Sequence, residues 1–287
     1  YFFGASESTI APAREYMQIV LGGNIISHTY FALNAVLRAT GLPRKAMNAS
    51  IYTVVINAVL DPLFIWLWGI RGAAMATIIA QCISLAWVIY VLCDRNHVVH
   101  FQKGGYKLQK WIVKRILSVG MSPFFMNSTA CLVVIVFNQG LKQYGGDMAI
   151  AAYGIVHKLT FLFIMVVMGL NQGMQPIASY NFGARLYARL KETVTLTAVC
   201  AIAVTSTGFI ICEMFPRTLV MMFTSDENLI EVAAKGLRIS FMFYPIVGFQ
   251  MVTSNFFRSI GYAGTSIFLS LTRQLLFLLP LMFILPH

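Results

Sequence analysis

Eight stretches of about 20 mostly apolar residues follow one another along the chain, with shorter polar connections between them. A run of this length crosses the hydrocarbon core of a bilayer as an α-helix. Hydrophobic residues make up 58% of the chain and charged residues only 11%, against about 25% charged in soluble domains. The sequence therefore predicts an all-α, polytopic membrane protein. The expected helices cover residues 13–38, 47–67, 71–93, 114–137, 148–172, 190–212, 230–256 and 265–286.

The charged residues and the cysteines argue against several other classes of protein. The formal net charge is +11, but the basic residues are spread over short connections, so we expect no nucleic-acid partner. The chain has no nucleophile motif, His/Glu metal box or glycine-rich phosphate loop, and we expect it not to be an enzyme. None of the five cysteines forms a Cys-x-x-Cys pair, so neither a metal site nor a disulfide framework is indicated.

The distribution of Lys and Arg predicts which side of the membrane each connection faces. Connections 41–46, 94–113 and 173–189 together hold eight Lys and Arg residues, whereas the alternate connections hold few. An excess of Lys and Arg marks the cytoplasmic side. We therefore predict that these three connections are cytoplasmic and that the first helix runs from the outside to the inside.

Residues 94–113 form the longest polar connection and predict a boundary between two helical bundles. A faint internal repeat supports this division, since Leu37-Arg38-Ala39-Thr40-Gly41 resembles Phe257-Arg258-Ser259-Ile260-Gly261. With a gap after the turn, Pro62 aligns with Pro280. Transporters built from repeated halves carry such symmetry. Both chain ends look cut, so we expect an internal fragment of a protein with twelve helices.

Asp61 is the only carboxylate placed well inside an expected spanning helix. Asn57 precedes it by one helical turn, so both polar groups lie on the same helix face. An ionisable group at the bilayer centre costs about 2.5 kcal/mol or more and indicates a functional site. The alternative is a carboxylate that bonds a neighbouring helix or a backbone donor near Pro62. In the repeat, the positions of Asn57 and Asp61 are occupied by leucine, which favours the functional interpretation.

The sequence resembles the multidrug and toxic compound extrusion (MATE) family, in the bacterial branch that includes the MepA and DinF types. The matching stretches are Leu37-Arg38-x-x-Gly41, Asn57-x-x-x-Asp61-Pro62-Leu63-Phe64, Gly69-Ile70-Arg71-Gly72-Ala73-Ala74-Met75-Ala76-Thr77, Gly169-x-x-x-Gly173-x-Gln175-Pro176-Ile177 and Tyr180-Asn181-Phe182-Gly183-Ala184. The resemblance implies two lobes and twelve helices. Residues 1–93 would be the C-terminal part of the N-lobe (family helices 4–6), and 94–113 the cytoplasmic linker. Residues 114–287 would be the C-lobe without its last helix (family helices 7–11).

The resemblance also implies an activity, namely export of cationic amphiphilic drugs by alternating access. Inward flow of Na⁺ or H⁺ would drive the export, with no other cofactor. The partners would be small drug molecules and the lipid bilayer, and the protein would be a monomer in the bacterial inner membrane.

The coupling site that the family implies maps to Asp61, Asn57 and Thr77, with a Na⁺ at Asp61 if the ion is a metal. The family's first-helix acid would lie before Tyr1. Asp61 is about six residues from the outer end of its helix and Thr77 about six residues into the next helix, so both lie about 9 Å deep. A fourth-helix asparagine of the family maps to Asn34, which lies near the inner face and fits less well by depth.

Three polar residues of the second half are candidates for lining or gating a cavity: Lys158, Arg273 and Gln175. Cations at membrane depth face a protein interior or extend to the interface. Lys158 and Arg273 would also suit a second function, a lipid-linked saccharide flippase of the same superfamily that holds a pyrophosphate. A third alternative is an inactive fragment.

Overall fold

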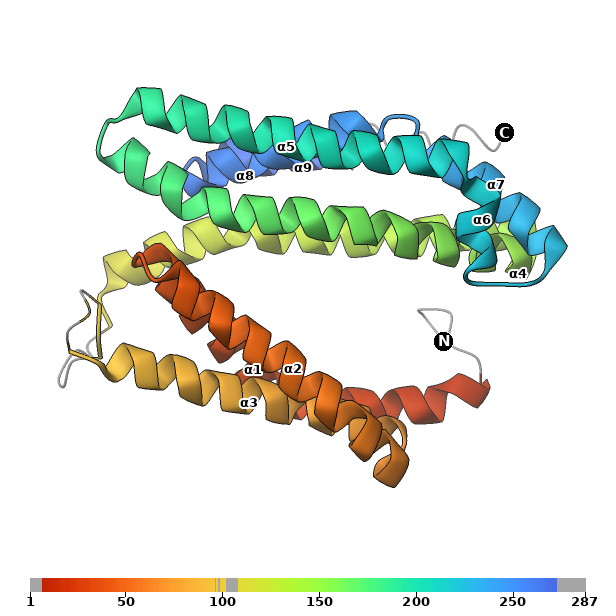
Figure 1. The fold of residues 1–287 in the computed structure, drawn as a ribbon, viewed down its shortest axis with the longest axis horizontal. Coiled ribbons are helices and arrows are strands. Elements are labelled where there is room, and N and C mark those ends of the chain that lie inside the picture. Colours follow the sequence, from red (N-terminus) through yellow and green to blue (C-terminus); the bar gives the residue numbers. More distant parts are fainter. Residues whose placement is uncertain (1–6, 96, 98, 102–107, 273–287) are drawn as a thin grey trace. The chain divides into compact units, whose positions relative to one another are not determined.

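The computed structural model describes residues 7–95, 97, 99–101 and 108–272, and all regular structure in this part of the chain is helical (Figure 1). The chain divides into two compact units, unit 1 (Tyr1–Lys107) and unit 2 (Leu108–His287). The division falls within the polar connection 94–113. Whether the units are the two family lobes stays a prediction.

Unit 1 contains three long helices, α1 (Glu7–Ala39), α2 (Pro43–Trp68) and α3 (Ile70–Cys93). α1 is followed by Gly41, whose φ of 84° is left-handed, and Leu42 N–H donates to the Leu37 carbonyl at 3.0 Å. This bond closes the helix end around the glycine. Pro43 then opens α2, where a missing N–H costs nothing. α2 and α3 are separated by Gly69 alone (φ 58°), so the two helices fold back as a hairpin.

The interior of unit 1 is apolar at one end and carries hydroxyl groups further along. Its buried cluster joins all three helices near the ends where α1 and α3 finish, and consists of Tyr30, Leu37, Ala46, Ala49, Val88, Val91 and Leu92. Next to it, Thr53 of α2 lies 3.0 Å from the Tyr30 hydroxyl and 2.7 Å from the Ser84 hydroxyl. One hydroxyl from each helix therefore meets inside the bundle.

Unit 2 begins with α4 (Lys110–Gly183), which contains a backbone break at Gly146 (φ 63°, ψ −162°). The break separates two membrane-length helices, Lys110–Leu141 and Gly145–Gly183, and the chain turns back there (Figure 1). The remaining helices are α5 (Tyr187–Met214), α6 (Pro216–Met221), α7 (Glu227–Phe241), α8 (Tyr244–Ser259) and α9 (Ala263–Leu271).

Most of the predicted spans have a counterpart in the structure. Six described helices are long and apolar enough to cross a membrane, and α7 with α8 makes a seventh if this pair, bent by 51°, is one span. The bend interrupts the span predicted at 230–256, and Pro245 lies in the first turn of α8. Of the span predicted at 265–286, the structure describes only the part up to residue 272, most of it in α9. The rest lies outside the described residues.

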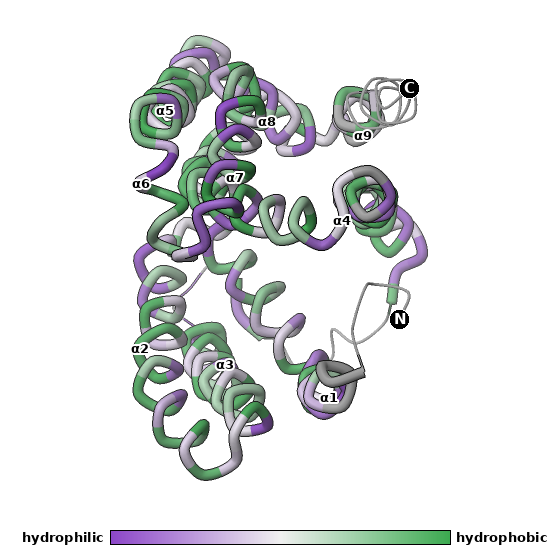
Figure 2. The backbone as a smooth tube through the Cα atoms, turned by 90° about the vertical axis from the view of Figure 1, so that its right-hand side faces the viewer, coloured by the Kyte–Doolittle hydropathy of each residue, from purple (hydrophilic) through white to green (hydrophobic). Residues whose placement is uncertain are grey.

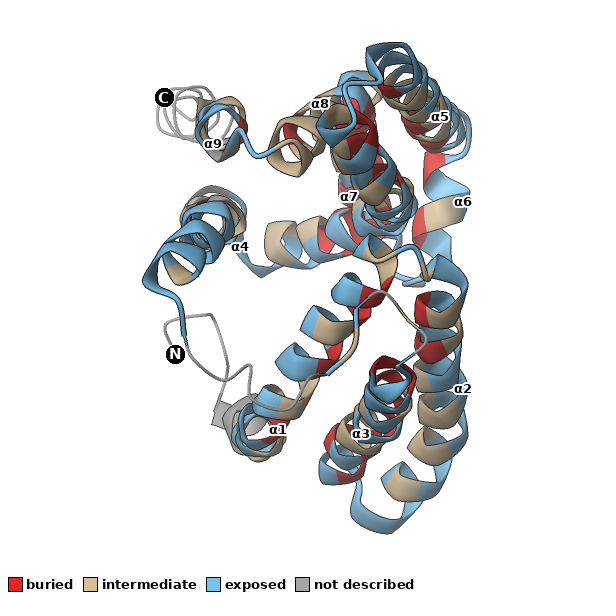
Figure 3. Cartoon of the chain, turned by 90° about the vertical axis from the view of Figure 1, so that its left-hand side faces the viewer, coloured by how far each residue is buried: buried red, intermediate tan, exposed pale blue. Residues whose placement is uncertain are grey.

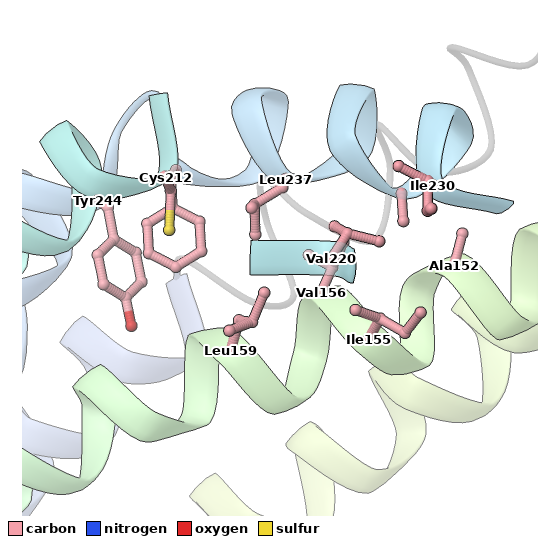
Figure 4. Packing of buried hydrophobic residues seen from close by; sticks show 11 residues of the cluster. Ala152, Ile155, Val156, Leu159, Cys212, Val220, Ile230, Leu237 and Tyr244 are labelled. Carbon is pink, nitrogen blue, oxygen red and sulfur yellow. The ribbon is translucent and has the colours of Figure 1, made fainter. Parts of the chain in front are cut away.

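Two apolar clusters hold unit 2 together. In the first, α4 packs against α5, α6, α7 and α8 (Figure 4). Its buried members are Ala152, Ile155, Val156, Leu159, Cys212, Val220, Ile230, Ala233, Leu237, Phe241 and Tyr244. The second cluster joins α4, α5 and α8, with Val167, Met174, Ala178, Leu190, Ala201 and Val252. In both, small residues let the helix backbones approach closely.

Large apolar side chains also cover the outside of both units. Trp66 is 83% exposed, Ile25 78% and Val59 68%. No residue in the most apolar window of α2 is buried. In Figure 2, green apolar segments run along this helix. In Figure 3, much of the same helix has the colour of exposed residues. A soluble protein does not expose so much contiguous apolar surface, so these faces suit the apolar interior of a membrane.

The repeat seen in the sequence is visible in the backbone of two turns. Each backbone hydrogen bond of the α1–α2 turn has a counterpart in the α8–α9 turn, and the donor and acceptor always lie the same number of residues further along the chain. Tyr262 N–H donates to the Phe257 carbonyl at 2.9 Å, as Leu42 does to Leu37 at 3.0 Å. Gly261 has a φ of 89°, close to the 84° of Gly41. The helix pair α1–α2 therefore corresponds to α8–α9 at this turn.

Candidate functional site

Asp61, Asn57 and Thr77 meet in the α2–α3 hairpin of unit 1. The Asn57 Nδ2 donates to Asp61 Oδ1 at 3.0 Å and to Thr77 Oγ1 at 3.4 Å. All three residues are half-buried. Of the four residues expected in the coupling site, Asp61 and Thr77 thus both accept a hydrogen bond from a third, Asn57.

The hairpin geometry explains this meeting. Because Gly69 is the only residue between α2 and α3, residues that lie equally far before and after it come to similar depths. Gly72 lets the two helices come close, since a Cβ at this position would lie 1.9 Å from the Phe64 carbonyl oxygen. Asp61 lies seven residues before the end of α2 at Trp68, about 10 Å along the helix axis.

The hydrogen bonds leave acceptor oxygens available in this group. The Thr77 hydroxyl donates to the Ala73 carbonyl at 3.0 Å, so its oxygen accepts from Asn57. Asn57 uses its N–H groups on Asp61 and Thr77. Pro62 has no N–H, so the Ala58 carbonyl lacks the bond that a helix normally supplies. Carboxylate, amide, hydroxyl and carbonyl oxygens are the ligand types that hard cations take, and a carboxylate also accepts a proton.

No Lys, Arg or His of the described chain forms an ion pair with Asp61. The nearest basic residue along α3 is Arg71, and its guanidinium pairs with Glu15 instead. It donates through Nε and Nη2 to both carboxylate oxygens of Glu15, at 2.8 and 2.7 Å. Among the described residues, no basic side chain therefore neutralises Asp61, and its carboxylate is available to a cation from outside the chain.

Asn34 lies apart from this group. It is 2% exposed, its Nδ2 donates to the Ala46 carbonyl at 3.0 Å, and its Oδ1 accepts from Arg38. Ala46 and Asp61 are fifteen residues apart on α2, about 22 Å along the helix axis. This placement agrees with the poor fit of Asn34 by depth, and these two hydrogen bonds of its side chain are local to the α1–α2 turn.

The candidates of unit 2 are not brought together in the described structure. Lys158 and Gln175 are exposed and lie more than four turns apart along α4. The Gln175 carbonyl accepts from the Ser179 hydroxyl at 2.8 Å. Arg273 lies outside the described residues. A shallow depression of about 430 Å³ lies along α5, lined by Ala188, Lys191, Glu192, Thr195, Leu196 and Val199, and contains none of these candidates.

One polar residue that the sequence analysis did not select is Asn171 of α4. It is 4% exposed, and neither its Nδ2 nor its Oδ1 has a hydrogen-bond partner among the described residues. An unsatisfied buried amide costs about 1–3 kcal/mol. The signal in the sequence was an asparagine within an apolar run, between Gly169 and Gly173.

Membrane-length helices, lipid-facing apolar surfaces and a polar group at membrane depth define a multi-pass protein of the cell membrane. The chain belongs to the MatE family, the MATE transporters, whose profile matches residues 1–63 and 118–284. This match confirms the family expected from the motifs.

Individual relatives and solved structures agree with this assignment. The "Multidrug export protein MepA" of Staphylococcus aureus (strain MSSA476) is 25% identical over 291 residues, covering 98% of this chain and 62% of the relative. The solved "MATE multidrug transporter DinF-BH" is 33% identical with a TM-score of 0.87, covering 99% of this chain and 64% of that chain. A MOP superfamily transporter from Pyrococcus furiosus, 24% identical with a TM-score of 0.90, shares the fold, covering 99% of this chain and 64% of that chain. The chain thus spans less than two thirds of the length of these relatives.

Proposed function

We propose that the full-length protein is a secondary active multidrug exporter and not an enzyme. It would export cationic amphiphilic compounds by alternating access, in exchange for Na⁺ or H⁺. The observation that carries the proposal is the Asp61–Asn57–Thr77 group between two membrane-length helices, in which the carboxylate has no basic partner among the described residues. The printed names of the MepA and DinF-BH relatives support drug export.

In this mechanism the cation and the drug stabilise different orientations of the transporter. A cation on Asp61 removes the cost of an uncompensated charge at membrane depth and so favours the conformations in which the group is desolvated. The drug favours the opposite orientation through its own contacts. Each ligand shifts the equilibrium only by the difference between its affinities for the two states.

The test is Asp61→Asn in the full-length protein, expressed in a drug-sensitive bacterium. We expect drug resistance to fall to the level of cells without the transporter, at unchanged protein level in the membrane, because a neutral amide neither supplies the negative charge that balances a bound cation nor takes up a proton. The matched control is Asp147→Asn, which changes an exposed aspartate of unit 2 and should leave resistance unchanged. Full resistance in Asp61→Asn would remove this residue from the mechanism.

The coupling ion is identified with purified protein in liposomes. Drug movement is measured under an imposed Na⁺ gradient and, separately, under an imposed pH gradient. We expect one of the gradients to drive transport in the unmodified protein and neither to drive it in Asp61→Asn.

A lipid-linked saccharide flippase is the second candidate function, and Lys158 favours it. This cation lies well inside the membrane-length part of α4 and has no carboxylate partner among the described residues. Transport of ethidium by the full-length protein supports drug export. Transport of a lipid-linked precursor, with no movement of ethidium, supports the flippase.

A further inference from the structure

The ion pairs of Lys and Arg with glutamate are confined to one end of each unit in the described structure. In unit 1, Arg71 bonds Glu15 where α3 begins. In unit 2, the pairs lie around the end of α5 and along α6 and α7, and are Arg217–Glu227, Lys235–Glu231 and Arg238–Glu213. The positive-inside rule places these ends on the outer side of the membrane.

The arginines at the opposite, predicted cytoplasmic ends have no such partner. Arg38, in the last turn of α1, and Arg258, in the last turn of α8, are half-buried. Neither guanidinium lies within 4.0 Å of a carboxylate in the described chain. A half-buried cation at a membrane interface without a counter-charge favours an anion from outside the protein.

Each of the two guanidiniums is held by an asparagine whose own amide is anchored to the backbone. Asn34 Nδ2 donates to the Ala46 carbonyl, and its Oδ1 accepts from Arg38. In unit 2, Asn255 Nδ2 donates to the Met251 carbonyl at 3.0 Å, and its Oδ1 accepts from Arg258. A guanidinium has five N–H donors, so this contact orients it and leaves other donors available.

The turns themselves do not use these donors. In the first turn, backbone N–H groups donate to the carbonyls of Leu37 and Arg38; in the second, they donate to those of Phe257 and Arg258. The carbonyls at the helix ends, which a basic side chain often caps, are therefore already bonded. The same arrangement occurs twice, in different units and at corresponding places of the repeat, although Asn34 and Asn255 do not align in sequence.

We propose that Arg38 and Arg258 each bind the phosphate group of an anionic phospholipid of the cytoplasmic leaflet. The planar guanidinium matches a phosphate with two parallel hydrogen bonds. The cytoplasmic leaflet carries anionic head groups at the depth of these helix ends. The apolar surface next to each turn accommodates the acyl chains: Phe31 of α1 is 56% exposed, and Phe268 of α9 66%.

The experiment measures lipid binding to the purified full-length protein in detergent, by native mass spectrometry and by the thermal unfolding midpoint. Phosphatidylglycerol is compared with phosphatidylcholine. The variants are Arg38→Gln and Arg258→Gln, and the matched control is Arg217→Gln, which removes an arginine already paired with glutamate. We expect phosphatidylglycerol to bind and to raise the midpoint of the unmodified protein and of the control. Each test variant should lose about tenfold in affinity for it, the value of one charge-assisted contact.

Three outcomes would overturn the proposal: no preference for phosphatidylglycerol in the unmodified protein, an equal preference in all variants, or equal stabilisation by inorganic phosphate. The last outcome would assign the arginines to a small soluble anion. If Arg38→Gln does not fold, Arg38→Lys keeps the charge without the planar fork, and weaker phosphatidylglycerol binding is expected. Unchanged binding in Arg38→Lys counts against the proposal. Because the readout is lipid binding, the result is independent of drug export.

Discussion

Asn57 holds the candidate coupling site together, because its amide reaches both the carboxylate of its own helix and the hydroxyl of the next one. The bond to Asp61 runs along one helix face and follows from the spacing in the sequence. The bond to Thr77 crosses the hairpin and depends on the packing of α2 on α3. The depths of Asp61 and Thr77 were predictable, whereas the orientation of the amide was not.

Asn171 supports a prediction about stability. Replacing it with leucine, which branches at the same carbon, removes a buried amide without hydrogen-bond partners in the described part of the chain. We expect Asn171→Leu to stabilise the protein by about 1–3 kcal/mol, the cost of an unsatisfied buried polar group, and to raise the thermal unfolding midpoint in detergent. The control is Asn181→Leu, which should destabilise because it removes the 2.9 Å bond to the Ile177 carbonyl. A lower midpoint in Asn171→Leu would contradict this account of the site.

The helices show which features follow from the local sequence and which depend on tertiary packing. A hydropathy reading finds the spans of α1, α2, α3 and α5 because long apolar runs favour uninterrupted helices in lipid. It does not find the break between α7 and α8, where Phe243 leaves helical geometry before Tyr244 and Pro245 open the next helix. There, Tyr244 is buried against Phe241 and Phe163, with its hydroxyl donating to the Thr160 carbonyl at 2.7 Å. Tertiary packing therefore accompanies a bend that hydropathy alone does not reveal.

The α2–α3 hairpin gives a prediction for one glycine. In Gly72→Ala, the new Cβ would meet the Phe64 carbonyl, which is backbone and cannot move aside cheaply. We expect a loss of about 1–3 kcal/mol or more, as for other overpacked interiors, measured as a lower unfolding midpoint and less protein in the membrane. Gly22→Ala is the control, since a Cβ there has no neighbour within 4 Å, and it should be neutral or slightly stabilising. Equal midpoints for the two variants would show that the helices do not approach closely at Gly72.

At the scale of the whole molecule, the excess positive charge predicts the orientation in the membrane. Single cysteines placed at Arg44 and at Arg217, in a full-length protein without its native cysteines, test this with a membrane-impermeant maleimide. In intact cells we expect labelling of Arg217→Cys and not of Arg44→Cys. Both should react after the membrane is opened, which controls for side-chain access. Labelling of Arg44→Cys in intact cells would invert the predicted topology.

The sequence alone was enough for the class of protein, the order of the helices, the family and the carboxylate at membrane depth. These properties depend on apolar run length, on the spacing of Asn57 and Asp61, and on motif order, which are local in the chain. Only the folded structure revealed the three-helix arrangement of unit 1, the close approach at Gly72 and the unsatisfied amide of Asn171. They depend on which helix faces meet, and that is set by side-chain packing between residues far apart in sequence.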